Sequence, residues 1–240
     1  MKTFKGDFDH FLNKLKNNEH FALSRWGDGE LMILENKFID IRHKGDGEFM
    51  YDPKSQIHVK MREILLNSYK YVDDNYYIGI ACRCCVGKEK FEYMKKLSGQ
   101  PEENLTWANI FVNSNYKYFL SELIPVLKEK KIILIANNKS KPENLPFNVE
   151  QFYPIGIDAW VNSSQLIQKL MMDISEYNMN NYIYLIAAGP LANIITYEFW
   201  KFNKKNTYID IGSTLDKMLG LKLTRNYLKG AETLNKTCIW

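Results

Sequence analysis

Short apolar runs alternate along this chain with stretches in which apolar residues recur at helical spacing. The runs are rich in β-branched and aromatic residues and predict buried strands at 21–23, 76–81, 131–136, 149–157, 182–187 and 207–211. The helical spacing predicts helices at 4–15, 55–69, 88–97, 116–127, 166–177 and 190–202, with Ser163 or Ser164 as the cap of the helix at 166–177. Segments 105–112 and 220–240 stay unassigned. The alternation indicates an α/β fold with a mainly parallel sheet flanked by helices.

Composition narrows the class of protein. The 240 residues suffice for one large domain, and we expect a single domain over 1–240. The 32 basic and 28 acidic residues are interspersed and give a net charge of +4, which argues against nucleic acid as the main ligand. The N-terminus lacks a secretory signal, and the most apolar window, 182–195, is broken by Gly189-Pro190. We expect a cytoplasmic protein without a transmembrane segment, and peripheral membrane contact stays open.

Polar residues and glycines gather where the predicted strands end. They lie at 25–28, 82–85, 137–138, 158–160, 189–190 and 210–213. In open parallel sheets, ligands bind beyond the carboxyl ends of the strands. The sequence therefore predicts that most of its unusual residues meet at one edge of the sheet.

The turn after the first strand, Ser24 to Glu30, carries the densest set of functional groups. We expect Gly27 and Gly29 to allow positive φ and close backbone approach, so that Asp28 and Glu30 point to one place. Two carboxylates beside Arg25 suggest Mn²⁺ or Mg²⁺ holding a nucleotide diphosphate, with the planar guanidinium on a phosphate edge. An ordinary capped surface turn is the alternative.

Further candidates lie later in the chain. The tetrapeptide Gly-Asp-Gly-Glu recurs at 45–48, as a second carboxylate loop or as an ordinary loop ended by Pro53. Asn109, Asn113 and Asn115 either bind sugar hydroxyls or form turns and caps.

Two aromatic segments could contact the nucleotide. Asp158 and Trp160 offer a carboxylate to ribose hydroxyls and a ring to a base, unless the ring is simply packed. Arg225 and Tyr227 could close over a diphosphate or dock the C-terminal segment.

Other chemistries lack their motifs. Cys82, Cys84 and Cys85 do not have the paired spacing of a zinc module, so we expect them to be reduced and free of metal. There is no Gly-x-Ser-x-Gly elbow and no phosphate-binding loop ending in Gly-Lys-Ser/Thr. The four histidines are scattered, which is typical of surface or core positions.

Three motifs follow one another along the chain: Ser24-Arg25-Trp26-Gly27-Asp28-Gly29-Glu30, Ala188-Gly189-Pro190 and Asp210-Ile211-Gly212-Ser213. Together they resemble the glycosyltransferase family with the GT-D fold, formerly a domain of unknown function, over nearly the whole chain. The resemblance implies a single Rossmann-like domain, a nucleotide-sugar donor, typically a UDP-sugar, and a divalent metal on Asp28 and Glu30. Ser213 stands where better-known members carry a histidine, which leaves donor and acceptor open.

The resemblance implies a metal-dependent glycosyltransferase that transfers a sugar from a nucleotide-diphosphate sugar to a glycan or glycoprotein acceptor. We expect the donor to contact Arg25, Gly27, Gly29, Asp158, Trp160, Gly189, Ser213 and Arg225. The alternatives are a non-catalytic nucleotide- or phosphosugar-binding module of the same fold and a metal-dependent phosphoesterase, which the lack of histidine-rich metal motifs disfavours.

An inverting transfer requires a carboxylate that accepts the proton of the acceptor hydroxyl. Asp216 follows the last strand by several residues and is the preferred candidate. Asp210 is the second candidate, but it lies within that strand and is expected instead to support the turn. A retaining transfer would need no such base.

Overall fold

Seven parallel strands form the central sheet. The computed structural model describes residues 1–45, 49–162 and 164–230, and its strand order is β5-β4-β1-β9-β8-β6-β7. The strands are β1 (Ala22–Trp26), β4 (Tyr76–Ile80), β5 (Leu105–Trp107), β6 (Lys131–Asn137), β7 (Gln151–Ile155), β8 (Tyr182–Ile186) and β9 (Thr207–Asp210). A separate antiparallel pair joins β2 (Ile39–Asp40) to β3 (Met50–Tyr51). The α/β class expected from the sequence is confirmed.

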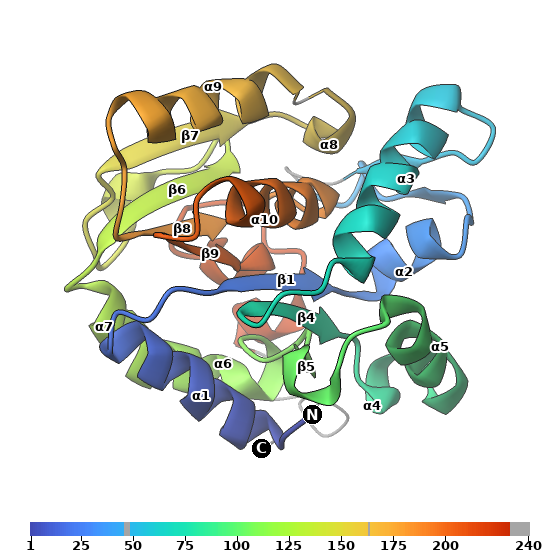
Figure 1. Cartoon of the computed structure of the whole chain (residues 1–240), viewed down its shortest axis with the longest axis horizontal. Coiled ribbons are helices and arrows are strands. Elements are labelled where there is room, and N and C mark those ends of the chain that lie inside the picture. Colours follow the sequence, from blue (N-terminus) through green and yellow to red (C-terminus); the bar gives the residue numbers. More distant parts are fainter. Residues whose placement is uncertain (46–48, 163, 231–240) are drawn as a thin grey trace.

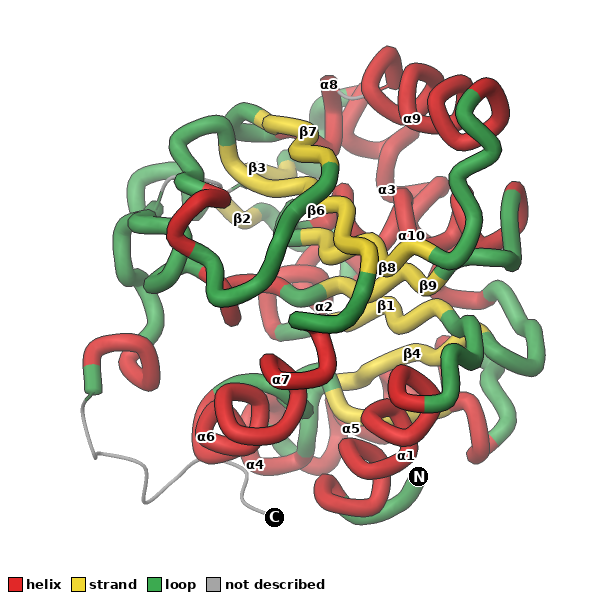
Figure 2. The backbone as a smooth tube through the Cα atoms, turned by 90° about the vertical axis from the view of Figure 1, so that its left-hand side faces the viewer, coloured by secondary structure: helices red, strands yellow, loops and turns green. Residues whose placement is uncertain are grey.

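Helices cover both faces of this sheet (Figures 1 and 2). One face packs against α2 (Asp28–Leu34), α3 (Gln56–Lys70), α5 (Lys88–Ser98), α8 (Ala159–Asn162), α9 (Ser164–Glu176) and α10 (Pro190–Phe202). The other packs against α1 (Phe4–Lys16), a π-helical turn (Phe119–Leu123) and α7 (Ile124–Leu127). The short helix α4 (Arg83–Val86) follows β4. Among the described residues, no helix combines the length and apolarity needed to cross a membrane.

The sequence of β6 shows why two cores form. Successive side chains of a strand point to opposite faces. Ile133 and Ile135 are buried in the core under α10, and Ile132 and Leu134 are buried in the core under α1. The unbroken apolar run of this strand therefore reflects a sheet that is covered on both sides.

Two predicted elements differ in extent. The predicted strand at 21–23 continues to Trp26, because the polar residues that follow Leu23 find partners inside the protein. The predicted helix 116–127 breaks into α6 (Tyr116–Tyr118), the π-helical turn and α7. Pro125 near the start of α7 has no N–H to donate to the preceding turn, which disfavours a regular α-helix there.

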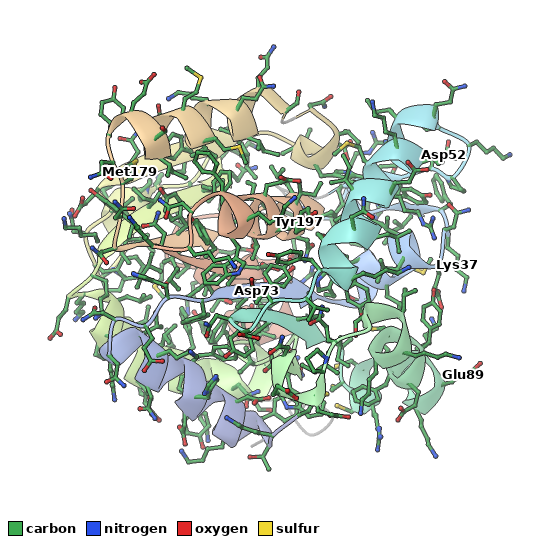
Figure 3. All side chains as sticks on the ribbon, viewed as in Figure 1. Lys37, Asp52, Asp73, Glu89, Met179 and Tyr197 are labelled. Atoms are coloured by element: carbon green, nitrogen blue, oxygen red, sulfur yellow. The ribbon has the colours of Figure 1, made fainter. Side chains whose placement is uncertain are left out.

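Asp73, labelled in Figure 3, precedes β4 at the amino edge of the sheet and contacts residues from other segments. Trp200 Nε1 donates to Asp73 Oδ1 over 3.0 Å, and Lys204 pairs with the same carboxylate. Asn104 Nδ2 donates to the Asp73 carbonyl over 2.9 Å. The carboxyl edge contains the cavity that carries the candidate residues.

Candidate active site

A cavity of about 390 Å³ lies at the carboxyl edge of the sheet. Its walls come from residues that end or follow β1, β4, β5, β6, β8 and β9, and from the segment 221–227. The volume lies within the range of small-molecule sites, about 300–1,000 Å³. Most of the predicted strand ends therefore converge on one site, as expected, and the end of β7 does not.

The floor of the cavity is formed where β1 and β9 separate, which we call the β1–β9 opening. β1 pairs with β4 from Ala22 to Trp26, but with β9 only at Ala22 and Leu23. Beyond this point, Asp210 Oδ2 accepts the backbone N–H of Arg25 over 3.1 Å, and Asn193 Nδ2 donates to the Arg25 carbonyl over 2.9 Å. Two side chains therefore replace the missing ladder and keep the backbone satisfied.

The side chain of Arg25 is oriented by backbone groups. Its Nε donates to the Ala108 carbonyl over 2.5 Å, and its Nη1 lies 3.4 Å from the Asp210 carbonyl. The guanidinium also lies over the Phe111 ring, 5.8 Å from its centroid. A cation held this way in a cavity wall suits a phosphate, because its planar fork is already oriented.

The metal candidates Asp28 and Glu30 come from the first turn of α2, and both line the cavity. Glu30 Oε2 accepts the N–H of Gly27 over 3.0 Å, whereas the exposed Asp28 accepts the N–H of Gly29 over 3.1 Å. The nearby Asp210 carboxylate is 6% exposed and also accepts the N–H of Gly212 over 3.0 Å. Both oxygens of Asp210 therefore accept backbone N–H groups, as expected for a residue that supports the turn.

The expectation of positive φ at Gly27 and Gly29 is wrong. Gly27 is the N-cap of α2 with φ −87°, and Gly29 lies inside that helix. The expected close approach does occur, since a Cβ on Gly29 would lie 3.1 Å from Phe49 Cζ. Among the described glycines that line the cavity, positive φ occurs instead at Gly189 and Gly212, both at 53°. At Gly212, a Cβ would also lie 3.1 Å from Arg25 Nη1, so this glycine leaves room for the guanidinium.

The carboxyl groups of the opening repel one another. Burial, followed by the charges of Asp210 and Asp28, raises the pKa of Glu30 to about 7. Burial raises the pKa of Asp210 to about 6, although Arg25 opposes this shift. Glu30 and Asp210 therefore keep their protons to a higher pH than solvent-exposed carboxyl groups do.

Asp28 and Glu30 fit a hard divalent cation by donor type. Mg²⁺ and similar cations take one or two protein carboxylates and complete their shell with phosphate oxygens and water. Within the described ranges, these carboxylates do not form a three-ligand cluster, since the cluster found there consists of cysteines. A cation at this place would therefore depend on a bound diphosphate for its remaining ligands.

The segment after β9 forms the outer wall. A 3₁₀ turn (Gly212–Leu215) leads to Asp216, which lines the cavity together with Ser213 and Arg225. Ser213 Oγ and Tyr227 Oη share a hydrogen bond of 3.0 Å, and the Tyr227 ring packs against Tyr116. These contacts dock the segment over the site. The proposed proton transfer at Asp216 stays a prediction.

The predicted asparagines divide between wall and core. Asn109 and Asn113 line the cavity, whereas Asn115 is fully buried and donates to the Asn109 carbonyl over 3.1 Å. Asn109 is 6% exposed and its Oδ1 has no hydrogen-bond partner among the described residues. A buried acceptor without a partner is costly, so this atom is suited to a ligand hydroxyl.

The structure does not bring Asp158 and Trp160 to the cavity, so their expected contact with the nucleotide is not supported. Trp160 is 1% exposed, and its ring packs against His58 and Tyr51, which leaves no open face for a base. Asp158 accepts the N–H of Met50 over 2.7 Å and lies 3.4 Å from an Arg42 nitrogen. Its observed role is to hold β3, next to the loop that carries Phe49.

Some cavity residues were not predicted as binding residues. Phe49 lies against Gly29 and Gly189, Asn137 ends β6 in the wall, and Lys222 lines the outer side. Asn193 on α10 acts from behind the site, through Arg25 and Ser24. Of these residues, only Asn137 could have been found from the sequence, because it ends a buried strand. Residues 46–48 of the second Gly-Asp-Gly-Glu segment lie outside the described residues, and so does the candidate helix cap Ser163.

These features define an α/β protein with a ligand cavity at the carboxyl edge of an open parallel sheet. No family model matches the sequence, and neither does any curated protein. Two solved structures of domain of unknown function 1792, one of them with selenomethionine, have a similar fold. Each gives a TM-score of 0.56 at 13% identity, over 85% of this chain and 76% of the other. One is described as having a distinct glycosyltransferase fold, and the likeness shows that this chain has that fold.

Proposed function

We propose that the protein is a metal-dependent glycosyltransferase. Its donor would be a nucleotide-diphosphate sugar, with a UDP-sugar expected, and its acceptor a glycan or glycoprotein. The observation that carries the proposal is the β1–β9 opening, where an oriented guanidinium and two metal-type carboxylates line one cavity. The sheet that builds this opening has a glycosyltransferase fold.

The diphosphate is placed beside Arg25, with Lys222 and Arg225 on the outer wall. Asp28 and Glu30 would hold Mn²⁺ or Mg²⁺ against the diphosphate. The metal would supply positive charge for the leaving diphosphate. Arg25 contributes to the same stabilisation, because its orientation is set before the donor binds.

The sugar is placed toward the residues that follow β5 and β6. Asn109 Oδ1 needs a donor, and sugar or ribose hydroxyls supply one. Asn137 at the end of β6 also lies in the wall, and its Oδ1 accepts the N–H of Lys139 over 2.9 Å. Hydrogen bonds between side-chain amides and sugar hydroxyls contribute orientation and specificity more than affinity.

The proton of the acceptor hydroxyl is assigned to Asp216, if transfer inverts the anomeric carbon. Asp216 lies in the cavity wall, whereas both oxygens of Asp210 already hold backbone N–H groups. A carboxylate that accepts a proton in the transition state contributes about 10²–10⁴-fold to the rate.

Thermal-shift measurements with nucleotide diphosphates test donor binding, because a ligand that binds only the folded state raises its stability. UDP should raise the melting temperature more with Mn²⁺ than with EDTA. Asp28→Asn should remove the difference, and the matched control Asp158→Asn should keep it. Equal shifts in Mn²⁺ and EDTA would contradict the metal role, and no shift with any nucleotide diphosphate would contradict the proposed donor.

The alternative is a non-catalytic nucleotide- or phosphosugar-binding module. It predicts the same thermal shifts without turnover. Release of UDP from UDP-sugars, measured with and without added glycan acceptors, separates the two. Donor binding without any release or transfer across a panel of UDP-sugars would favour the binding module.

A further inference from the structure

We propose that Cys82, Cys84 and Cys85 form a binding site for one thiophilic metal ion, of which Zn²⁺ is the probe. Their three sulfur atoms lie within 4.8 Å of one another. The site adjoins the cavity of the β1–β9 opening but uses different chemistry, so it does not depend on the proposed transferase activity.

The fold brings these sulfurs together through one tight turn. Cys82 follows β4 in an extended conformation, and α4 begins at the next residue. The N–H groups of Cys85 and Val86 both donate to the Cys82 carbonyl, over 3.0 and 3.1 Å. The turn therefore folds Cys84 and Cys85 back over Cys82, an arrangement that the Cys-x-Cys-Cys spacing did not reveal.

The sulfur distances are shorter than those of a tetrahedral thiolate site, so the sulfurs must move apart to bind an ion. Cys82 Sγ lies 2.7 Å from Cys84 Sγ and 3.2 Å from Cys85 Sγ. Metal–sulfur bonds of about 2.3 Å in a tetrahedral site put the sulfurs about 3.8 Å apart. Cys84 and Cys85 are exposed, so small side-chain rotations provide the extra separation without moving the buried Cys82.

The surroundings favour sulfur as a ligand. Asn109 Nδ2 lies 3.6 Å from Cys82 Sγ and donates to it, and outer hydrogen bonds of this kind orient and stabilise ligating thiolates. Three protein sulfurs leave the fourth tetrahedral position for water or a small ligand. Each thiol that binds the ion releases its proton to solvent, and the step needs no oxidant.

The site connects two surfaces. Cys85 lines the cavity that contains Arg25 and Asp28, whereas Cys82 and Cys84 line a second, more open pocket with Phe91. A metal ion there would fix the β4–α4 turn in the wall of the donor cavity. Because its ligands are sulfurs, it would not compete for the cation proposed at the carboxylates.

The test uses the full chain purified with reductant. One equivalent of Cd²⁺ should produce a sulfur-to-cadmium charge-transfer band, and competition with a chromophoric chelator gives the Zn²⁺ affinity. Cys84→Ser and Cys85→Ser each remove an exposed ligand and should weaken Zn²⁺ binding at least about tenfold. Cys238→Ser is the control for cysteine loss and Asp28→Asn the control for the carboxylate site, and both should keep the band.

Three results would overturn the proposal. The first is no charge-transfer band in the reduced wild-type protein. The second is a band that persists in the Cys84→Ser/Cys85→Ser double variant. The third is a disulfide within 82–85 that remains in mass spectra of the reductant-treated protein, since it would consume two of the three ligands.

Discussion

Two corners of the carboxyl edge carry similar residues but differ in what they offer a ligand. At the β7–α8 corner, Asp158 pairs with Arg42 and holds the backbone of Met50. At the β1–β9 opening, no ion pair to Asp28 or Glu30 is found among the described residues. Among the described residues, Asp28 and Glu30 therefore lack the ion pair that Asp158 has.

The largest expected effect is on sugar-transfer turnover, and it distinguishes the two corners. Asp28→Asn and Glu30→Gln should each lower sugar-transfer turnover about a thousandfold, because the loss of a metal ligand removes several kcal/mol of charge stabilisation. Asp158→Asn should leave turnover within about twofold, since Asp158 lies outside the cavity. The measurement is single-turnover transfer with a UDP-sugar and Mn²⁺. A comparable loss in Asp158→Asn would make the β7–α8 corner the donor site.

Asp216→Asn should lower turnover about a hundredfold while donor affinity stays unchanged, because the amide keeps the shape of the side chain but cannot accept the proton. Calorimetry with UDP and the single-turnover rate give the two values. If the variant turns over at nearly the parent rate, Asp216 is not the base. A retaining mechanism or a carboxylate within 46–48 would then be the better hypothesis.

Arg25→Lys should weaken UDP binding about tenfold, because an ammonium cannot reproduce the planar fork that Ala108 and Asp210 orient. Gly212→Ala should produce a similar loss without removing the charge, since its Cβ would lie 3.1 Å from Arg25 Nη1. Calorimetric titration of both variants tests this. Parent affinity in Gly212→Ala would show that the position of the guanidinium does not matter.

The smallest expected effect is on stability. The folded state holds protons on Glu30 and Asp210 more tightly than the unfolded state, with pKa values raised to about 7 and about 6. Their contribution to stability is therefore full below about pH 4 and is lost as pH rises through about 4 to 7. The metal-free wild type should lose about 5 °C more in melting temperature between pH 5 and pH 8 than Glu30→Gln. Equal pH profiles would show that Glu30 is not buried beside other carboxylates.

The sequence predicted the fold well because its signals are local. Alternation of apolar runs and helical faces is set by burial, and β6 shows this directly with its two buried faces. The convergence of strand ends followed from the parallel topology alone. The supporting role of Asp210 was also predictable, since a carboxylate inside a buried strand must accept hydrogen bonds.

The details of the site depended on contacts that spacing cannot show. Asn193 reaches Arg25 from a helix 168 residues later, and nothing in its local sequence signals this contact. Trp160 was interpreted as a stacking residue, but an aromatic near a strand end packs equally well into the core, and its burial decides between the two. Gly27 and Gly29 do not have positive φ, because α2 begins within the turn.

A crystal structure with UDP and Mn²⁺ is the most direct test of the site. We expect an anomalous difference peak at Asp28 and Glu30, with the diphosphate against the Arg25 guanidinium in the β1–β9 opening. Nucleotide bound at the β7–α8 corner, or a diphosphate in the cavity without manganese at these carboxylates, would contradict the assignment.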